Sequence, residues 1–155
     1  AETLIAIGYP TQAQVFIREA IESDVFANFL FVDGTKSQDL LDAIGDSLEG
    51  MKGTAPNAGP ETEAYQAWEA AYTAEYGTVP NLPFIKEAYD AVVAIALAAE
   101  AAGSNDGAAI RDQLRAVAGP DGDVYVPGAE GVAAALEAIQ NGEDIDFQGA
   151  ATSLD

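Results

Sequence analysis

The chain has 155 residues, with 26 acidic and 6 basic side chains and a formal net charge of −20. A negative field of this size repels nucleic acid and anionic lipid, so we expect neither as a partner. The sequence has no cysteine and no histidine, which excludes disulfides, thiol nucleophiles and the commonest general base of enzymes. Its longest apolar stretch, residues 91–99, is too short to span a bilayer.

The first third of the chain alternates strand patterns with helix patterns. The apolar run at residues 3–8 predicts a buried strand, and a T-x-x-Q pattern from Thr11 predicts the start of a helix. The same pair of signals returns in a strand pattern at residues 28–32 and a second T-x-x-Q pattern from Thr35. A third strand is expected at residues 51–55. This alternation predicts an α/β fold, in which a parallel sheet has flanking helices.

The remainder of the chain has mainly helical periodicity. The predicted helices are residues 61–76, 84–102 and 108–117, and a last one that ends at Asn141-Gly142. Residues 119–128 are expected to form a loop, and residues 145–148 a strand. The helix at 84–102 is apolar nearly all round, so we expect it to be buried on several sides.

Aromatic residues form a stripe along the helix predicted at residues 61–76. Its members are Tyr65, Trp68, Tyr72 and Tyr76. Such a stripe can serve as a stacking platform for a ligand, but its helical spacing favours a face that packs into the core. We therefore interpret it as a core face.

Two residues follow the predicted strands at the edge where open α/β sheets bind their ligands. Tyr9 comes after the first strand and Asp33 after the second. A carboxylate here can pair with a ligand's ammonium group, and a tyrosine can pack on its apolar part. The alternative is that Gly-Tyr-Pro is merely a strand exit and Asp-Gly merely a turn.

Other sites find little support in the sequence. Asp121-Gly122-Asp123 and Glu143-Asp144 do not fit the calcium-loop pattern, so no metal is expected. Neither a phosphate-binding glycine motif nor a nucleophile elbow is present, so we expect no cofactor and no enzymatic activity.

Five stretches follow one another in an informative order. They are Ile7-Gly8-Tyr9-Pro10, Phe31-Val32-Asp33-Gly34, Leu48-Glu49-Gly50-Met51, the series Trp68, Tyr72, Tyr76-Gly77, Pro80, and Glu87-Ala88-Tyr89-Asp90-Ala91-Val92. In this order they resemble the C-terminal half of the type I periplasmic solute-binding proteins that serve branched-chain amino-acid (Leu/Ile/Val-binding) ABC transporters.

The resemblance implies two Rossmann-like lobes joined by a three-stranded hinge, with a ligand held in the cleft between them. Residues 1–55 would be part of the second lobe leading to the hinge, and residues 56–155 helical segments spanning both lobes. Asp33 would meet the ammonium group of an amino acid, and Tyr9 would line the cleft. The groups that hold the ligand's carboxylate would belong to an N-terminal segment outside this sequence.

The function implied is that of a periplasmic or other extracytoplasmic solute-binding component of an ABC transporter, with a permease as partner. A ligand-sensing ectodomain of a receptor with the same fold is the alternative. The chain resembles a fragment cut at both ends. An apolar surface on the helix at 84–102 would then be exposed, and we expect self-association, domain exchange or rearrangement to cover it.

Overall fold

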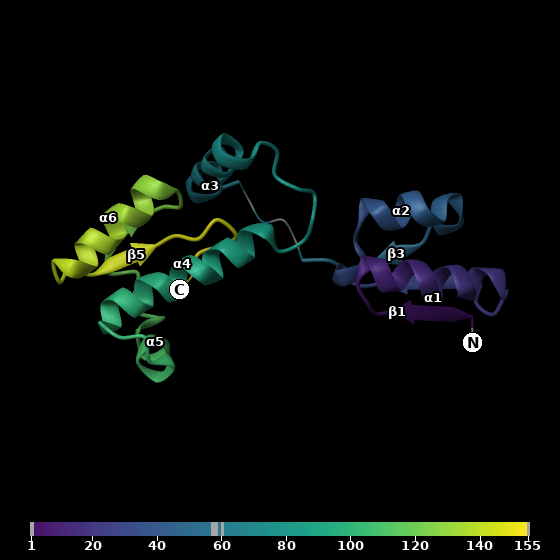
Figure 1. Ribbon diagram of the computed structural model, residues 1–155, viewed down its shortest axis with the longest axis horizontal. Coiled ribbons are helices and arrows are strands. Elements are labelled where there is room, and N and C mark those ends of the chain that lie inside the picture. Colours follow the sequence, from purple (N-terminus) through teal and green to yellow (C-terminus); the bar gives the residue numbers. More distant parts are fainter. Residues whose placement is uncertain (1, 57–58, 60, 155) are drawn as a thin grey trace. The chain divides into compact units, whose positions relative to one another are not determined.

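The structure is a computed structural model that describes residues 2–56, 59 and 61–154. The chain divides into two compact units (Figure 1). Unit 1 comprises residues 1–57 with 81–83, and unit 2 comprises residues 58–80 with 84–155. None of the helices in the described ranges is long and apolar enough to cross a membrane.

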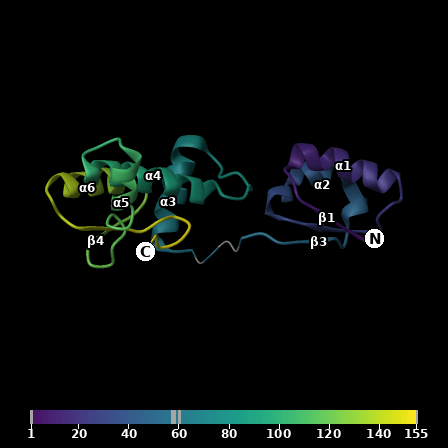
Figure 2. The ribbon, with the colours of Figure 1, turned by 90° about the horizontal axis from the view of Figure 1, so that it is seen from below.

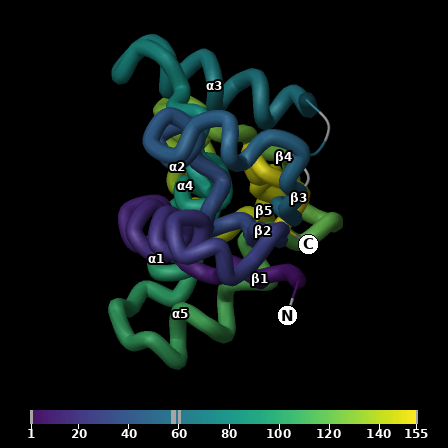
Figure 3. The backbone as a smooth tube through the Cα atoms, turned by 90° about the vertical axis from the view of Figure 1, so that its right-hand side faces the viewer, coloured from purple at the N-terminus to yellow at the C-terminus, as the bar shows by residue number. Residues whose placement is uncertain are grey.

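Unit 1 is a three-stranded parallel sheet with its connecting helices. Its elements are β1 (Thr3–Ala6), α1 (Pro10–Glu22), β2 (Asn28–Phe31), η1 (Asp33–Thr35), α2 (Gln38–Ile44), η2 (Gly45–Leu48) and β3 (Lys52–Gly53). The strands lie in the order β1-β2-β3, which Figure 3 shows side by side. Thr3 pairs with Asn28, and Leu30 pairs with Lys52. The α/β class predicted from the sequence is confirmed, and with it the parallel sheet with flanking helices.

The helices of unit 1 cover one face of the sheet. Figures 2 and 3 show α1 and α2 on the same side of the three strands. Ala6 and Phe29 are buried on that side against Ile17 of α1 and Leu40 of α2. Ile5 of β1 alternates with these residues along the strand and is 58% exposed. The second face of the sheet therefore presents apolar side chains to solvent.

Both predicted helix starts in unit 1 are wrong. Helix α1 begins at Pro10, before Thr11, because a proline at the first helical position has its φ already set for a helix. Helix α2 is capped by the Ser37 hydroxyl, which accepts a hydrogen bond from the backbone of its first turn. Thr35 instead donates its hydroxyl to the carbonyl oxygen of Val32 at 2.6 Å.

Unit 2 packs around one long helix. Its elements are α3 (Glu63–Tyr76), α4 (Ile85–Ala102), α5 (Gly107–Gln113), β4 (Asp123–Tyr125), α6 (Ala129–Gln140) and β5 (Ile145–Phe147). Helix α4 packs against α5 and α6 (Figure 1). The buried core is Val93, Leu97, Ala98, Val117, Ala135, Ala138, Ile145 and Phe147.

The loop predicted at residues 119–128 contains a strand. Its residues 123–125 pair in parallel with β5, Asp123 opposite Ile145. A Cβ atom added to Gly122 would lie 2.3 Å from the carbonyl carbon of Ile145, so this close approach needs a glycine.

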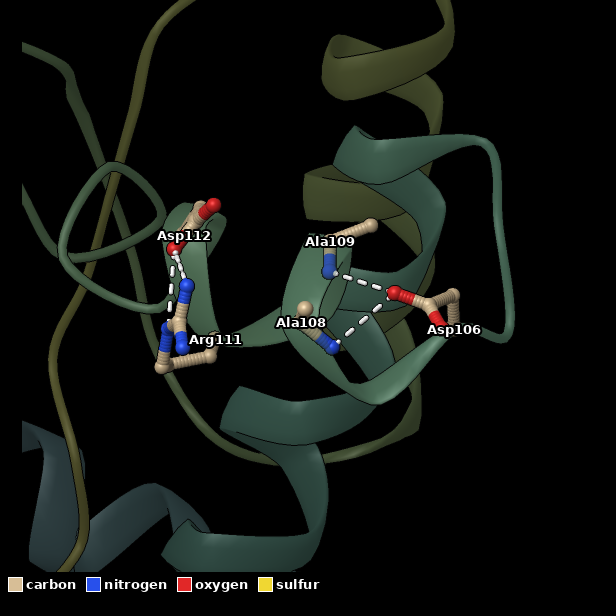
Figure 4. Close-up of polar contacts among 5 residues, drawn as sticks. All are labelled: Asp106, Ala108, Ala109, Arg111 and Asp112. Atoms are coloured by element: carbon tan, nitrogen blue, oxygen red, sulfur yellow. Dashed lines mark hydrogen bonds and ion pairs between the residues drawn. The ribbon is translucent and has the colours of Figure 1, made fainter.

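The predicted helix at 108–117 is also shorter than expected, since α5 ends at Gln113. Its start is fixed by Asp106, whose carboxylate accepts hydrogen bonds from the first turn (Figure 4). Figure 4 also shows the exposed Arg111–Asp112 ion pair on this helix.

A buried carboxylate ties the C-terminal segment to α4. Asp90 is 3% exposed, and its two oxygens each accept a backbone hydrogen bond at 2.7 Å, from Ala150 and Ala151. Burial raises the pKa of Asp90, and the two N–H groups partly oppose that rise. A Cβ atom at Gly149 would lie 2.6 Å from the Asp90 carboxylate, so the turn fits tightly around it.

The aromatic stripe on α3 is only partly a core face. Trp68 is buried, but Tyr76 is exposed, so the core interpretation is wrong for the end of the stripe. Neighbouring ring centroids lie 5.9 Å (Tyr65–Trp68), 5.5 Å (Trp68–Tyr72) and 5.1 Å (Tyr72–Tyr76) apart, with the ring planes tilted to each other. The stripe is thus a row of tilted aromatic contacts that becomes exposed towards the end of α3.

Candidate functional site

The two residues predicted to contact a ligand both lie at the carboxyl edge of the unit 1 sheet. Tyr9 immediately precedes α1, and Asp33 is the first residue of η1, separated from β2 by Val32 alone. Because β1 and β2 are parallel neighbours, their carboxyl ends meet at one edge. The topology therefore brings together the turns that carry these two residues.

Gly34 is the point of closest approach between the two turns. A Cβ atom at this position would lie 2.6 Å from the carbonyl oxygen of Gly8 and 3.5 Å from the Cδ1 atom of Tyr9. Contacts of 2.6 Å are sterically excluded, so only glycine allows this spacing. The ring of Tyr9 thus lies against the residue that follows Asp33, a contact the sequence analysis did not predict.

The turn that carries Asp33 is held by its own backbone. Both the hydroxyl and the N–H of Thr35 donate to the carbonyl oxygen of Val32, at 2.6 and 3.0 Å. The N–H of Lys36 donates to the carbonyl oxygen of Asp33 at 3.0 Å. Thr35 is buried, so water does not compete for these bonds. These hydrogen bonds therefore hold the backbone on both sides of Asp33 in place.

The polar tips of both residues are unengaged. Among the described residues, neither the Asp33 carboxylate nor the Tyr9 hydroxyl has a hydrogen bond or an ion pair. Tyr9 is 73% exposed, and Asp33 is half-buried. Such a pair offers one acceptor for a cationic group and one aromatic surface for an apolar group, which is the chemistry that an amino acid's ammonium group and neighbouring carbons require.

A separate hollow of about 400 Å³ lies beside the same turn. Val32 and Thr35 line it, while Tyr9 and Asp33 do not. Its floor is apolar, formed by side chains that include Phe31 and Leu40. The hollow had no signal in the sequence, because its lining comes from segments between residues 31 and 81 that only the fold brings together.

No metal centre accompanies either feature. Across the described part of the chain, no three Asp or Glu side chains come together in a way that could hold a metal ion. Asp121-Gly122-Asp123 lies at the start of β4, where Asp123 pairs with Ile145 in the sheet.

Comparisons with known proteins point to one family. A family model described as "Periplasmic binding protein" matches residues 1–140. A leucine-, isoleucine-, valine-, threonine- and alanine-binding protein of Pseudomonas aeruginosa is 30% identical over 109 residues. That alignment covers 70% of this chain and 29% of the relative, so the chain corresponds to less than a third of the relative's length. No solved structure matches the chain.

Proposed function

Since the chain belongs to the periplasmic binding protein family, in its type I branched-chain amino-acid branch, we propose that it contributes part of an amino-acid site through Asp33 and Tyr9. The proposal rests on the close approach of their two turns at Gly34. Among the described residues, neither the Asp33 carboxylate nor the Tyr9 hydroxyl has a hydrogen-bond partner. The Asp33 carboxylate accepts hydrogen bonds from the ligand's ammonium group, and the Tyr9 ring packs on the apolar part of the ligand.

The whole protein would act outside the cytoplasm as the solute-binding component of an ABC transporter, without catalysis. The family and the relative from P. aeruginosa, both described as binding proteins, support the solute-binding part. Delivery of the solute to a permease, an extracytoplasmic location and the assignment of residues 1–55 to a second lobe belong to the same proposal. So does the assignment of residues 56–155 to segments that span both lobes.

Amide chemical-shift titrations of the 155-residue chain test the ammonium contact. L-Leucine and 3-methylbutylamine both carry the ammonium group, whereas 4-methylpentanoate lacks it. We expect the two amines to shift the amides of residues 8–9 and 33–34 and to bind about tenfold more weakly to Asp33→Asn, through loss of a charge-assisted hydrogen bond. The matched control is Asp39→Asn, which removes the same charge from an exposed carboxylate on α2. Equal binding by Asp33→Asn and the control would refute the assignment.

Self-association of the chain through α4 is the remaining part of the proposal. Val92 is 67% exposed and Ile95 is 51% exposed, three residues apart and so on one side of the helix. The helix expected to be buried on several sides is buried along the side of Val93 and Leu97 instead. A second copy of the chain would cover this apolar strip by the same surface, although two chains of net charge −20 also repel each other.

Sedimentation velocity over a concentration series tests this interface. We expect the wild-type chain to associate and Val92→Lys to shift the distribution toward monomer. Val124→Lys makes the same change at a valine of similar exposure, 64%, on β4. A wild-type chain that stays monomeric at the highest concentration, or a control variant that dissociates equally, would contradict the proposal.

A further inference from the structure

The hollow beside the Asp33 turn differs in charge from the rest of the molecule. About one residue in six of the whole chain is acidic, yet none of the described residues that line the hollow is acidic. Two of the three lysines of the sequence, Lys36 and Lys52, do line it. On a chain of net charge −20, this hollow is a local site where an anion meets no lining carboxylate.

The two ammonium groups are also uncommitted. Within residues 2–56, 59 and 61–154, neither Lys36 nor Lys52 forms an ion pair or a side-chain hydrogen bond. Carboxylates outnumber cationic groups roughly fourfold in this sequence, yet among the described residues Arg18 and Arg115 also form no ion pair. What sets the two lysines apart is that they line one hollow together. A lysine on an edge strand can also serve to prevent unwanted strand pairing, and this reading would explain Lys52 of β3 but not Lys36.

The apolar side chains that line the hollow indicate that its ligand has an apolar part. Phe31, Leu40, Leu48 and Met51 provide apolar surface, and a volume of about 400 Å³ falls within the range of small-molecule pockets. Three of the polar side chains that line the hollow, Thr35, Ser37 and Gln38, already hydrogen-bond within the chain. Among the described lining residues, only the two lysines carry a charge.

We propose that this hollow is a second binding site, which takes a small organic anion with an apolar body, such as an aliphatic monocarboxylate. The apolar body lies on the floor formed by Phe31 and Leu48, and Lys36 and Lys52 pair with the carboxylate. The site is distinct from the Tyr9–Asp33 site, where the charge requirement is the opposite. Asp33 needs a cationic group, whereas the two lysines need an anionic one.

Amide chemical-shift titration of the 155-residue chain with 4-methylpentanoate tests the inference. We expect saturable shifts at residues 35–38 and 51–55. Lys36→Gln and Lys52→Gln should each weaken binding about three- to fivefold, as expected for loss of one partly exposed ion pair. Arg115→Gln removes the same charge from unit 2 and should leave binding unchanged. The neutral 4-methylpentanamide should bind more weakly than the acid.

The outcomes separate this inference from the proposed amino-acid site. Equal binding of acid and amide, equal weakening by Arg115→Gln, or no saturable shift would each overturn the anion site. Shifts confined to residues 8–9 and 33–34 that disappear in Asp33→Asn would overturn it too, because the probe would then occupy the other site. The first three results leave the binding of 3-methylbutylamine at Asp33 untouched. The fourth would also contradict the ammonium contact of Asp33, because 4-methylpentanoate has no ammonium group.

Discussion

The tie between Asp90 and the C-terminal segment allows a quantitative prediction. Its two carboxylate oxygens accept one N–H each, from Ala150 and Ala151, in a site that is almost fully buried. In Asp90→Asn the amide oxygen can keep one of these bonds, but the NH₂ group faces the other donor. A buried N–H left without an acceptor costs about 1–3 kcal/mol. We therefore expect Asp90→Asn to lower the free energy of unfolding by about 2 kcal/mol.

Urea denaturation followed by the fluorescence of Trp68, the one tryptophan, measures this loss. Removing a negative charge from a chain of net charge −20 also relieves some general repulsion, so a control of equal charge is needed. Asp112→Asn provides it, since Asp112 is exposed and pairs only with its exposed neighbour Arg111 at 2.6 Å. We expect this control to stay within about 1 kcal/mol of wild type.

Hydrogen exchange locates the effect. The amides of Ala150 and Ala151 should exchange faster in Asp90→Asn than in Asp112→Asn, because one or both lose their acceptor. Equal urea midpoints for the two variants, together with unchanged exchange at residues 150–151, would refute the reasoning. The carboxylate would then be a tolerated buried charge instead of a tie that stabilises unit 2.

Two further predictions concern local fit and pH. Gly34→Ala should destabilise unit 1 by about 1–3 kcal/mol and shift the amide resonance of Gly8, because the new methyl group would clash with the Gly8 carbonyl oxygen. The control Gly107→Ala, with no neighbour within 4 Å of its Cβ position, should be neutral or stabilising. Equal urea midpoints for the two variants would contradict the predicted clash. Burial raises the pKa of Asp90, so the unfolding free energy of wild type should fall as pH rises above about 4, and Asp90→Asn, which has no carboxyl group here, should fall less over the same range. A wild-type chain that instead gains stability relative to Asp90→Asn in urea titrations as pH rises would show the opposite sign.

The first two strands of unit 1 were predictable because each is a short apolar run bounded by turn residues. The starts of its helices were not, since Thr11 and Thr35 have the capping pattern while Pro10 and Ser37 occupy the decisive positions. Local sequence shows which residues are able to cap a helix. The tertiary contacts decide which of them does.

Strand β4 was missed for a different reason. Residues 123–125 contain an exposed Asp123 and Val124 and have no apolar run. They form a strand because β5 lies beside them, and that pairing joins residues about twenty positions apart. Short edge strands of this kind carry little signal of their own.

The candidate site was partly predictable. Because the carboxyl ends of parallel strands lie at one edge of a sheet, the sequence alone predicts that Tyr9 and Asp33 lie at the same edge. The fit of Gly34 against Gly8 depends on a distance of a few tenths of an ångström, which no residue pattern encodes. The hollow with its two lysines depends on segments far apart in sequence, so it too required the fold.

The way each unit closes its core bears on how the chain folds during synthesis. The sheet of unit 1 pairs Thr3 with Asn28 and Leu30 with Lys52, so all its strands exist before α3 has been made. Unit 2 buries Phe147 completely, and its core stays open until β5 leaves the ribosome. Unit 1 is therefore free to collapse early, whereas Leu97 of a nascent unit 2 lacks its last core partners until β5 has been made. Apolar surface that stays exposed over this interval favours aggregation.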